Sequence, residues 1–367
     1  MTSPAEAGER RRALVVGTGL IGGSIALGLR RRGWHVSGLD ADAARLSAAL
    51  ASGVIDAADD DLQAEVVFVA VPAASVASVA RGVLQTDGRM DDAVVTDVSG
   101  VKTTIVKESD HPHFIGGHPM AGSEQSGLHG ADPDLFVGAV WVLTPTATTD
   151  LEAFNRLKGV VMSLGAEVLV LSAADHDRLV AVVSHVPHLV AATLMNAAAD
   201  GAQQDGTLLR LAAGGFRDMT RVAAGQPTIW PGICDDNADA IVATLDLLID
   251  ALGAMRRRVA ERDHHSLLAV LQRAATARRA MSSGAPRPEE LVEVRIPVRD
   301  RPGALADVLV LATELTINVF DLEIAHSVEG DRGVLVVVID AAGAPTFAEA
   351  LADRGHRSSI SPVGPGR

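Results

Sequence analysis

The stretch that decides the fold is Gly17–Gly22, which reads GTGLIG and has the spacing GxGxxG. The apolar run Ala13–Val16 precedes it and predicts a strand, and Ile21–Leu29 follows with helical spacing. His35–Leu39 predicts the next strand. A GxGxxG turn between a strand and a helix, inside a βαβ unit, is typical of dinucleotide-binding domains. A flavodoxin-like fold with a chance glycine turn is the alternative.

The glycines of this turn have separate chemical roles. Gly17 permits the tight turn, Gly19 lets the backbone approach a pyrophosphate, and Gly22 lets helix and strand pack closely. Asp40 ends the second strand, where a carboxylate accepts hydrogen bonds from ribose hydroxyls and repels the 2′-phosphate of NADP. The pattern therefore predicts NAD as the cofactor. The predicted cofactor-binding residues are Gly17, Thr18, Gly19, Leu20, Ile21, Gly22, Asp40, Val71 and Asp97.

Apolar runs and helical stretches alternate from residue 12 to residue 173. This alternation predicts an α/β, Rossmann-type, doubly wound domain with a mostly parallel sheet. Residues 1–11, which come before it, are expected to form a flexible tail. The further expected strands are Val66–Val71, Ala93–Val98, Val140–Leu143 and Glu167–Leu171.

Residues 174–282 contain consecutive Ala- and Leu-rich helical stretches with little polar surface. Such helices are expected to pack between subunits, so the sequence predicts an all-α dimerisation and substrate domain and a homodimer. The expected helices are Asp175–Gly201, Gly206–Gly214, Asp218–Ala224, Pro227–Leu252 and Ala254–Met281.

The last part of the chain changes pattern again. Residues 283–289 are rich in Ser, Gly and Pro and predict a linker. Residues 290–367 predict a small α+β domain of order βαββα, with room for one last strand near Ser358–Val363. Its expected elements are the strand Leu291–Pro297, the turn Asp300–Gly303, the helix Ala304–Glu314, the paired strands Ile317–His326 and Gly333–Ile339, and the helix Thr346–Asp353.

Composition excludes several classes of protein. The 46 acidic residues exceed the 32 basic ones, and a net charge of −14 argues against binding nucleic acid or an anionic membrane surface. A single cysteine, Cys234, excludes an intrachain disulfide and a cysteine-based metal site. Glycines interrupt the first apolar run, so it does not resemble a signal peptide. We expect no membrane-spanning stretch and a cytoplasmic location.

Two further strings carry a resemblance to a known family. They are Gly116–Glu124, GGHPMAGSE, and Gly214–Arg221, GGFRDMTR. Together with Gly17–Ser24, GTGLIGGS, they resemble the prephenate/arogenate dehydrogenases of tyrosine biosynthesis, in order over roughly residues 12–280. The C-terminal part, with Asp300–Gly303, looks like an ACT domain, a regulatory module that some members carry. The resemblance implies an aromatic amino acid as its effector, and tyrosine is the one expected.

The resemblance implies an NAD-dependent oxidative decarboxylation. Prephenate would give its C4 hydride to NAD⁺ and lose carbon dioxide, so that the ring becomes aromatic in 4-hydroxyphenylpyruvate. Arogenate, with an amino group in place of the keto group, would give tyrosine directly. Another NAD-dependent dehydrogenase, or a non-catalytic sensor on the same fold, remains an alternative.

His118, expected on a loop after a strand, suits a general base because the pKa of imidazole lies near neutral pH. In the family the matching histidine contacts the 4-hydroxyl of the substrate. Arg221 suits a substrate carboxylate, because guanidinium forms bidentate pairs with it. From the residues alone, a structural loop histidine and a helix-surface arginine remain alternatives.

Other candidate residues come from the same motifs. Arg217 and Asp218 would share a helix face with Arg221, and the family places the glutamate that matches Glu124 at the pocket mouth. Family members usually carry serine where this chain has Gly100, so Ser99, one residue earlier, is the candidate catalytic serine. No metal is expected, because no carboxylate lies in register with the histidines. The remaining substrate-site candidates, which match family positions, are His176, His185, His188 and Trp230.

Overall fold

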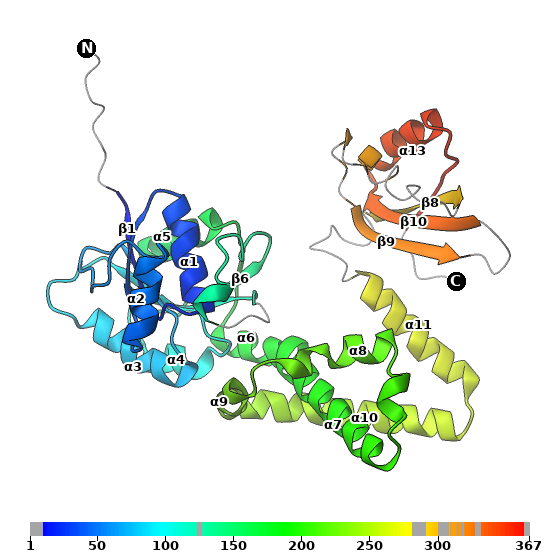
Figure 1. The fold of residues 1–367 in the computed structure, drawn as a ribbon, viewed down its shortest axis with the longest axis horizontal. Coiled ribbons are helices and arrows are strands. Elements are labelled where there is room, and N and C mark those ends of the chain that lie inside the picture. The colour runs from blue at the N-terminus through cyan, green and yellow to red at the C-terminus, as the bar shows by residue number, and fades with distance from the viewer. Residues whose placement is uncertain are drawn as a thin grey trace. The chain divides into compact units, whose positions relative to one another are not determined.

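The computed structural model describes residues 10–122, 127–280, 291–299, 308, 310–312, 314–315, 317, 319–326 and 332–362. The chain divides into two compact units, Met1–Ile249 and Asp250–Arg367. Figure 1 shows the ribbon coloured from blue at the N-terminus to red at the C-terminus. The predicted linker 283–289 and most of the predicted tail lie outside the described residues. Arg11, at the end of that tail, is described: its guanidinium pairs with Glu65 at 3.0 Å and lies over the ring of Trp34.

The first unit contains a seven-stranded sheet of order β2-β1-β3-β4-β5-β6-β7. All neighbouring strands are parallel except β5 and β6. The prediction of a mostly parallel, Rossmann-like sheet is therefore confirmed. The strands are β1 (Arg12–Val16), β2 (His35–Leu39), β3 (Val66–Val69), β4 (Val94–Asp97), β5 (Phe114–Pro119), β6 (Val140–Thr144) and β7 (Glu167–Val170).

Buried side chains fill both faces of this sheet. Successive strand residues point to opposite faces, so Val15 lies in one core cluster with Ile25 and Leu157, while Leu14 lies in the other with Val76. A sheet covered on both faces explains why its strands are nearly continuous apolar runs. The helices of this part are α1 (Leu20–Arg31), α2 (Ala43–Ala51), α3 (Ala73–Leu84), α4 (Thr103–Glu108) and α5 (Leu151–Ser163).

The position of His118 corrects one prediction. It does not lie on a loop after a strand but within β5, where it pairs in register with Val142 of β6. The preceding Gly116 and Gly117 hide this strand from an apolar pattern. The structure requires them, since a Cβ at Gly116 would stand 2.4 Å from Oγ1 of Thr144.

The helical part differs from the predicted helices at several ends. The first predicted helix is α6 (Ala173–Val180), a π-helical turn (Ala181–His185) and α7 (Val186–Gln204). Gly206–Gly214 is not a helix but holds a 3-10 turn, Leu208–Leu211. The remaining elements are α8 (Gly214–Thr220), the 3-10 turns Arg221–Ala224 and Pro227–Ile229, α9 (Trp230–Asp236), α10 (Ala238–Ala260) and α11 (His264–Ala280).

Two predicted helix boundaries are wrong. The single predicted helix Pro227–Leu252 breaks at Asn237, whose side chain is held by a hydrogen bond to the carbonyl of Asp177. The predicted break near Gly253 is absent, because α10 runs through it. The chain turns instead at Arg262, which has a positive φ of 56°. Glycine inside a helix weakens it without necessarily ending it.

The second unit ends in a four-stranded antiparallel sheet of order β11-β8-β10-β9. Phe347 and Leu351 of α13 (Ala344–Asp353) pack with Val294 and Val337 of this sheet. The predicted turn Asp300–Gly303 and most of the predicted helix Ala304–Glu314 lie outside the described residues. The strands are β8 (Leu291–Arg299), β9 (Val319–His326), β10 (Arg332–Asp340) and β11 (Ser359–Pro362).

One helical segment, Ala173–Gln203, is long and apolar enough to span a membrane by length and composition alone. No such stretch was expected from the sequence. The segment includes His176, Asp177 and His185, whose side chains are buried against other parts of the chain. One such helix is weak evidence and does not indicate a membrane protein.

Candidate active site

The carboxyl ends of β1, β2 and β3 surround a cavity of about 440 Å³. The strand order reverses between β1 and β3, and nucleotides bind at such a switch point in open parallel sheets. Gly17, Asp40 and Val71, all predicted to bind the cofactor, line this cavity. The volume is in the range of small-molecule sites.

The glycine turn fits a pyrophosphate. Gly17 has a φ of +99°, and a Cβ there would stand 2.3 Å from the carbonyl oxygen of Ala70. A Cβ at Gly22 would stand 1.9 Å from the carbonyl oxygen of Gly17, so neither position accepts a side chain. Gly19 has open space around it and precedes α1 without a capping side chain. The first turn of α1 therefore presents uncapped N–H groups, which attract phosphate.

Asp40 is held in place by its neighbours. Its carboxylate accepts hydrogen bonds from the Thr18 N–H at 2.8 Å, the Thr18 hydroxyl at 3.0 Å and the Asp42 N–H at 2.9 Å. The guanidinium of Arg45 lies 3.4 Å away. Burial by itself would raise the pKa of Asp40, but these hydrogen bonds and Arg45 outweigh it and lower the pKa. The carboxylate is therefore ionised at neutral pH, as a ribose acceptor must be.

His118 begins a line of three side chains. Its Nδ1 lies 2.8 Å from Nε2 of His176, and Nδ1 of His176 lies 2.8 Å from Oδ1 of Asp177. His118 comes from β5, whereas the other two come from α6. The side chains of His176 and Asp177 are almost completely buried.

His118 is neutral at physiological pH. Burial lowers the pKa of its imidazole well below the usual value of about 6.5, and the positive charge of Lys102 lowers it further. The carboxylate of Asp177 acts in the opposite direction but does not prevail. A neutral imidazole at this position can accept a proton.

Asp97 and Lys102 form a buried ion pair beside this histidine, and both side chains have no exposed surface. The hydroxyl of Ser99 donates to Asp97 and lies 3.0 Å from Nζ of Lys102. Asp97 also accepts a hydrogen bond from the Gly117 N–H at 3.1 Å. Burial lowers the pKa of Lys102, while Asp97 acts to raise it. Asp97, predicted to bind the cofactor, and Ser99, the predicted catalytic serine, are thus joined in one cluster that orders the loop after β4.

The position next to the imidazole is residue 100. A Cβ at Gly100 would lie 3.8 Å from both Nε2 and Cε1 of His118, in ordinary contact. A serine hydroxyl at that position would therefore be within reach of Nε2. Ser99 is instead occupied with Asp97 and Lys102, so a role for it at the substrate stays a prediction.

His185, His188 and Trp230 form a second aromatic group in the helical part. The ring of His188 stacks on Trp230 with centroids 3.7 Å apart, and His185 meets the same indole edge-on at 6.2 Å. Nδ1 of His185 lies 3.2 Å from the Asn237 amide, which donates at 2.8 Å to the carbonyl of Asp177. The amide thereby links this group to the residues around His118.

The other predicted substrate residues lie at the surface of the single chain. Arg217 and Asp218 are exposed on α8, and Arg221 is exposed at the start of the 3-10 turn that follows. Nε of Arg217 donates to the carbonyl of Ala212 at 3.2 Å. Glu124 lies outside the described residues. In the part of the chain that the structure describes, no three His, Cys, Asp or Glu side chains gather as metal ligands.

Three residues that contact the site, Asp177, Asn237 and Arg45, were not predicted from the sequence to have a role in it. Asp177 had a usable signal, since it follows His176 directly and stands near the start of a helix. Asn237 and Arg45 had none, because their partners are 60 and 5 residues away in sequence and no motif includes them.

Two family models match the chain in succession. The nucleotide-binding domain of prephenate dehydrogenase matches residues 25–170, and the dimerization domain of prephenate dehydrogenase matches residues 172–273. The chain belongs to the prephenate dehydrogenase family. The family predicted from the sequence, with its class of NAD-dependent oxidoreductases, is thus confirmed, and NAD is the cofactor that the cleft described above fits.

Relatives of this family agree over most of the chain. The prephenate dehydrogenase of Bacillus subtilis is 32% identical over 339 residues, covering 88% of this chain and 90% of the relative. The solved arogenate dehydrogenase of Synechocystis has 34% identity and a TM-score of 0.65, covering 73% of this chain and 98% of that one. Prephenate dehydrogenase from A. aeolicus, solved with hydroxyphenyl propionate and NAD⁺, has 28% identity and a TM-score of 0.69, covering 74% and 99%.

The dimerization-domain match also accounts for the apolar segment Ala173–Gln203, all of which lies inside it. A dimerisation domain needs apolar surface that a single chain leaves uncovered.

Proposed function

We propose that this protein is a prephenate dehydrogenase, which converts prephenate and NAD⁺ to 4-hydroxyphenylpyruvate, carbon dioxide and NADH. The observation that carries the proposal is the neutral His118 at the end of β5, linked to His176 and Asp177. β5 is parallel to β4, and β4 to β3, so His118 lies at the same edge of the sheet as the glycine turn. A proton acceptor and a nucleotide site therefore share one edge.

His118 acts on the 4-hydroxyl of the ring. When bound, NAD⁺ accepts the hydride from C4. As the hydride leaves, Nε2 of His118 takes up the hydroxyl proton and stabilises the carbonyl character that develops at C4. Loss of carbon dioxide then supplies the electron pair that makes the ring aromatic, and His118 returns the proton to the phenolic oxygen. No net proton is released, because the dianion of prephenate and NAD⁺ balance the monoanion of the product, carbon dioxide and NADH.

We propose that Arg221 binds a carboxylate of the substrate, because guanidinium pairs with carboxylate through two parallel hydrogen bonds. Arg217, Asp218, Glu124, His185, His188 and Trp230 are proposed to line the same pocket. In a single chain Arg221 lies at the surface of the helical part. A homodimer that covers this surface would enclose the pocket, and the dimerization-domain match supports that arrangement.

Arogenate is the second candidate substrate. The arogenate dehydrogenase of Synechocystis, at 34% identity, is as similar to this chain as the prephenate dehydrogenases are. The ring chemistry is the same for both substrates, so His118 would serve either one. The choice depends on the side chains around the keto or amino group.

We propose that residues 290–367, at the end of the second unit, form an ACT-like domain that binds tyrosine. Its described part is a four-stranded antiparallel sheet with α13 packed on it, which suits a small regulatory module. A soluble biosynthetic enzyme of this kind is expected in the cytoplasm.

The test is to measure NADH formation with prephenate and with arogenate, each with NAD⁺ and with NADP⁺, in the presence and absence of tyrosine. We expect activity with prephenate and NAD⁺, and inhibition by tyrosine that is lost after truncation behind Ser283. Activity with arogenate alone would replace the first candidate by the second. Absence of activity with both substrates would refute the proposal.

A further inference from the structure

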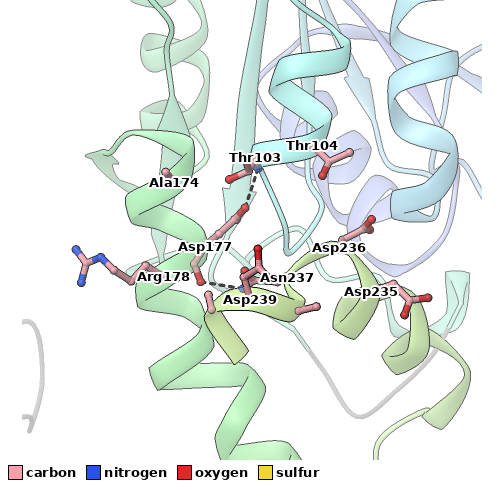
Figure 2. Close-up of a pocket in the computed structure, with 11 residues that line it drawn as sticks. Thr103, Thr104, Ala174, Asp177, Arg178, Asp235, Asp236, Asn237 and Asp239 are labelled. Atoms are coloured by element: carbon pink, nitrogen blue, oxygen red, sulfur yellow. Dashed lines mark hydrogen bonds between the residues drawn. The ribbon is translucent and has the colours of Figure 1, made fainter. Parts of the chain in front are cut away.

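Asp177 occupies a junction between three parts of the first unit. Its carboxylate accepts hydrogen bonds from the N–H groups of Lys102 and Thr103, each at 2.8 Å, and contacts His176 at 2.8 Å. Its own carbonyl accepts the amide of Asn237. Figure 2 shows Asp177 reaching from α6 to the start of α4, with the bonds to Thr103 and Asn237 dashed. The three contacts on the side chain keep the carboxylate in one orientation.

The contacts on Asp177 determine which atoms of His176 carry a proton. Burial would raise the pKa of Asp177, but the hydrogen bonds from His176, Thr103 and Lys102 outweigh it and lower the pKa. An ionised carboxylate only accepts hydrogen bonds, so Nδ1 of His176 must be the donor. A neutral imidazole donates from one ring nitrogen only, so the state that we infer for His176 has Nδ1 protonated and Nε2 unprotonated. Nε2 of His176 is therefore an acceptor.

The same logic extends to the next ring. Nε2 of His176 faces Nδ1 of His118 at 2.8 Å, so Nδ1 of His118 must be the donor. The imidazole of His118 is neutral, which leaves its Nε2 unprotonated. Nε2 faces Gly100, where an added Cβ would lie 3.8 Å from this nitrogen. The lone pair thus points away from His176 and is available to a substrate.

We infer that Asp177 is a positioning residue that acts through His176 to fix His118 in the tautomer whose Nε2 accepts the substrate proton. The inference rests on the proposed function for its catalytic meaning. Its structural content, the tautomer of His118 in the resting enzyme, does not depend on which substrate is used. A residue that only caps α4 would leave that tautomer unchanged.

The most direct test replaces His176, which removes its hydrogen bonds to His118 and Asp177 but keeps the bonds from Asp177 to the start of α4. His176→Leu cannot accept the hydrogen bond from Nδ1 of His118, and we expect kcat to fall about 10²–10³-fold with KM nearly unchanged. His176→Gln offers an amide oxygen to His118 and an amide N–H to Asp177, and we expect it to recover at least tenfold of that loss. Equal activity of the two variants, or normal activity of His176→Leu, would overturn the inference.

Asp177→Ala tests the residue itself, and two other Asp→Ala variants serve as its controls. Asp150→Ala removes a carboxylate that caps α5 by accepting the Ala153 N–H, and so reports what loss of a cap costs in stability. Asp236→Ala removes a carboxylate from the cavity of about 390 Å³ that Asp177 also lines. Figure 2 shows Asp236 on the wall of this cavity formed by the end of α9. We expect kcat to fall at least 100-fold in Asp177→Ala and less than threefold in both controls.

A spectroscopic measurement separates failure of this inference from failure of the proposed function. ¹⁵N NMR of histidine-labelled enzyme, without substrate, distinguishes protonated from unprotonated ring nitrogens, and the His118 signals are assigned by their loss in His118→Asn. We expect Nε2 of His118 to be unprotonated in the wild type and to become a mixture of tautomers in His176→Leu. A protonated Nε2 in the wild type would refute the inference even if the enzyme oxidises prephenate. An unprotonated Nε2 would support it even if both substrates fail.

Discussion

The sheet of the nucleotide-binding part and the helices that follow it differ in where their apolar side chains lie. In the sheet, Leu14, Phe68 and Leu143 are completely buried by elements of the same chain. In the helices, Val183, Leu211 and Leu247 are 65%, 80% and 72% exposed. The sheet therefore has a complete core of its own, whereas the helices, which match a family dimerization domain, leave large apolar side chains exposed in the single chain. The packing of the sheet can therefore be explained from one chain, whereas the packing of the helices cannot.

The largest expected effect belongs to the sheet. His118→Ala removes the proton acceptor, and we expect kcat to fall about 10²–10⁴-fold with substrate affinity largely kept. The oligomeric state should not change, since His118 lies in β5 and outside the helical part. Steady-state kinetics and sedimentation measure the two properties. A nearly normal kcat would remove His118 from the catalytic step.

Lys102→Met tests how much the buried ion pair between Lys102 and Asp97 contributes to the stability of the sheet. It leaves the carboxylate of Asp97 buried without its partner, and we expect the free energy of unfolding to fall by about 3–5 kcal/mol in urea titrations. Arg156→Met breaks an ion pair with Asp92 that is partly exposed, and should cost at most about 1 kcal/mol. Equal losses would mean that burial does not distinguish the two pairs.

Leu247→Asp tests the other half of the comparison. We expect the dimer to dissociate, with at least a 100-fold increase in Kd, because the charge would be buried at the subunit contact. Leu151→Asp is the matched control, since Leu151 is 70% exposed on α5 of the nucleotide-binding part. Sedimentation equilibrium measures both variants. A stable Leu247→Asp dimer would place the contact elsewhere.

Much of the sheet could be predicted from the sequence, and less of the helical part. The glycine turn and the apolar runs of β1, β2 and β3 depend on local spacing, which a single chain displays. β5 was harder to place beyond Phe114, because Gly116 and Gly117 are required by contacts with Thr144 and Thr96 that no local pattern reveals. The break at Asn237 depends on Asp177, 60 residues earlier.

The pH dependence of activity should report the protonation of His118, which lies in the sheet. The pKa of His118 is lowered below its ordinary value of about 6.5, so the acid limb of kcat/KM should lie below pH 6.5. The sign for stability follows from the same shift. Below about pH 6.5 the imidazole of His118 binds a proton in the unfolded chain but not in the folded one. The free energy of unfolding is therefore unaffected by this group at neutral pH and falls as the pH falls below about 6.5. The contribution of His118 is the difference between the wild type and His118→Gln when the free energy of unfolding is measured against pH. An acid limb above pH 6.5 would contradict the assignment.

The smallest effect is a gain. Gly100→Ser places a hydroxyl beside Nε2 of His118, and Gly100 has no positive φ that would strain a side chain. One added hydrogen bond of about 0.5–1.5 kcal/mol should raise kcat/KM about 2–10-fold. Ser99→Ala should not reproduce the change, because the Ser99 hydroxyl is bound to Asp97 and Lys102. Comparison of kcat/KM for the two variants decides which position faces the substrate.

The π-helical turn Ala181–His185 has a consequence for how the two parts are joined. A π turn adds one residue to a helical turn, and each residue of a helix advances the side-chain direction by about 100°. The segment upstream can thus direct His176 toward β5 while the segment downstream directs His188 toward Trp230. Removing one residue here would restore ordinary i to i+4 bonding and rotate every later side chain away from its partner. A single-residue insertion thus sets the angular offset between the two histidine groups.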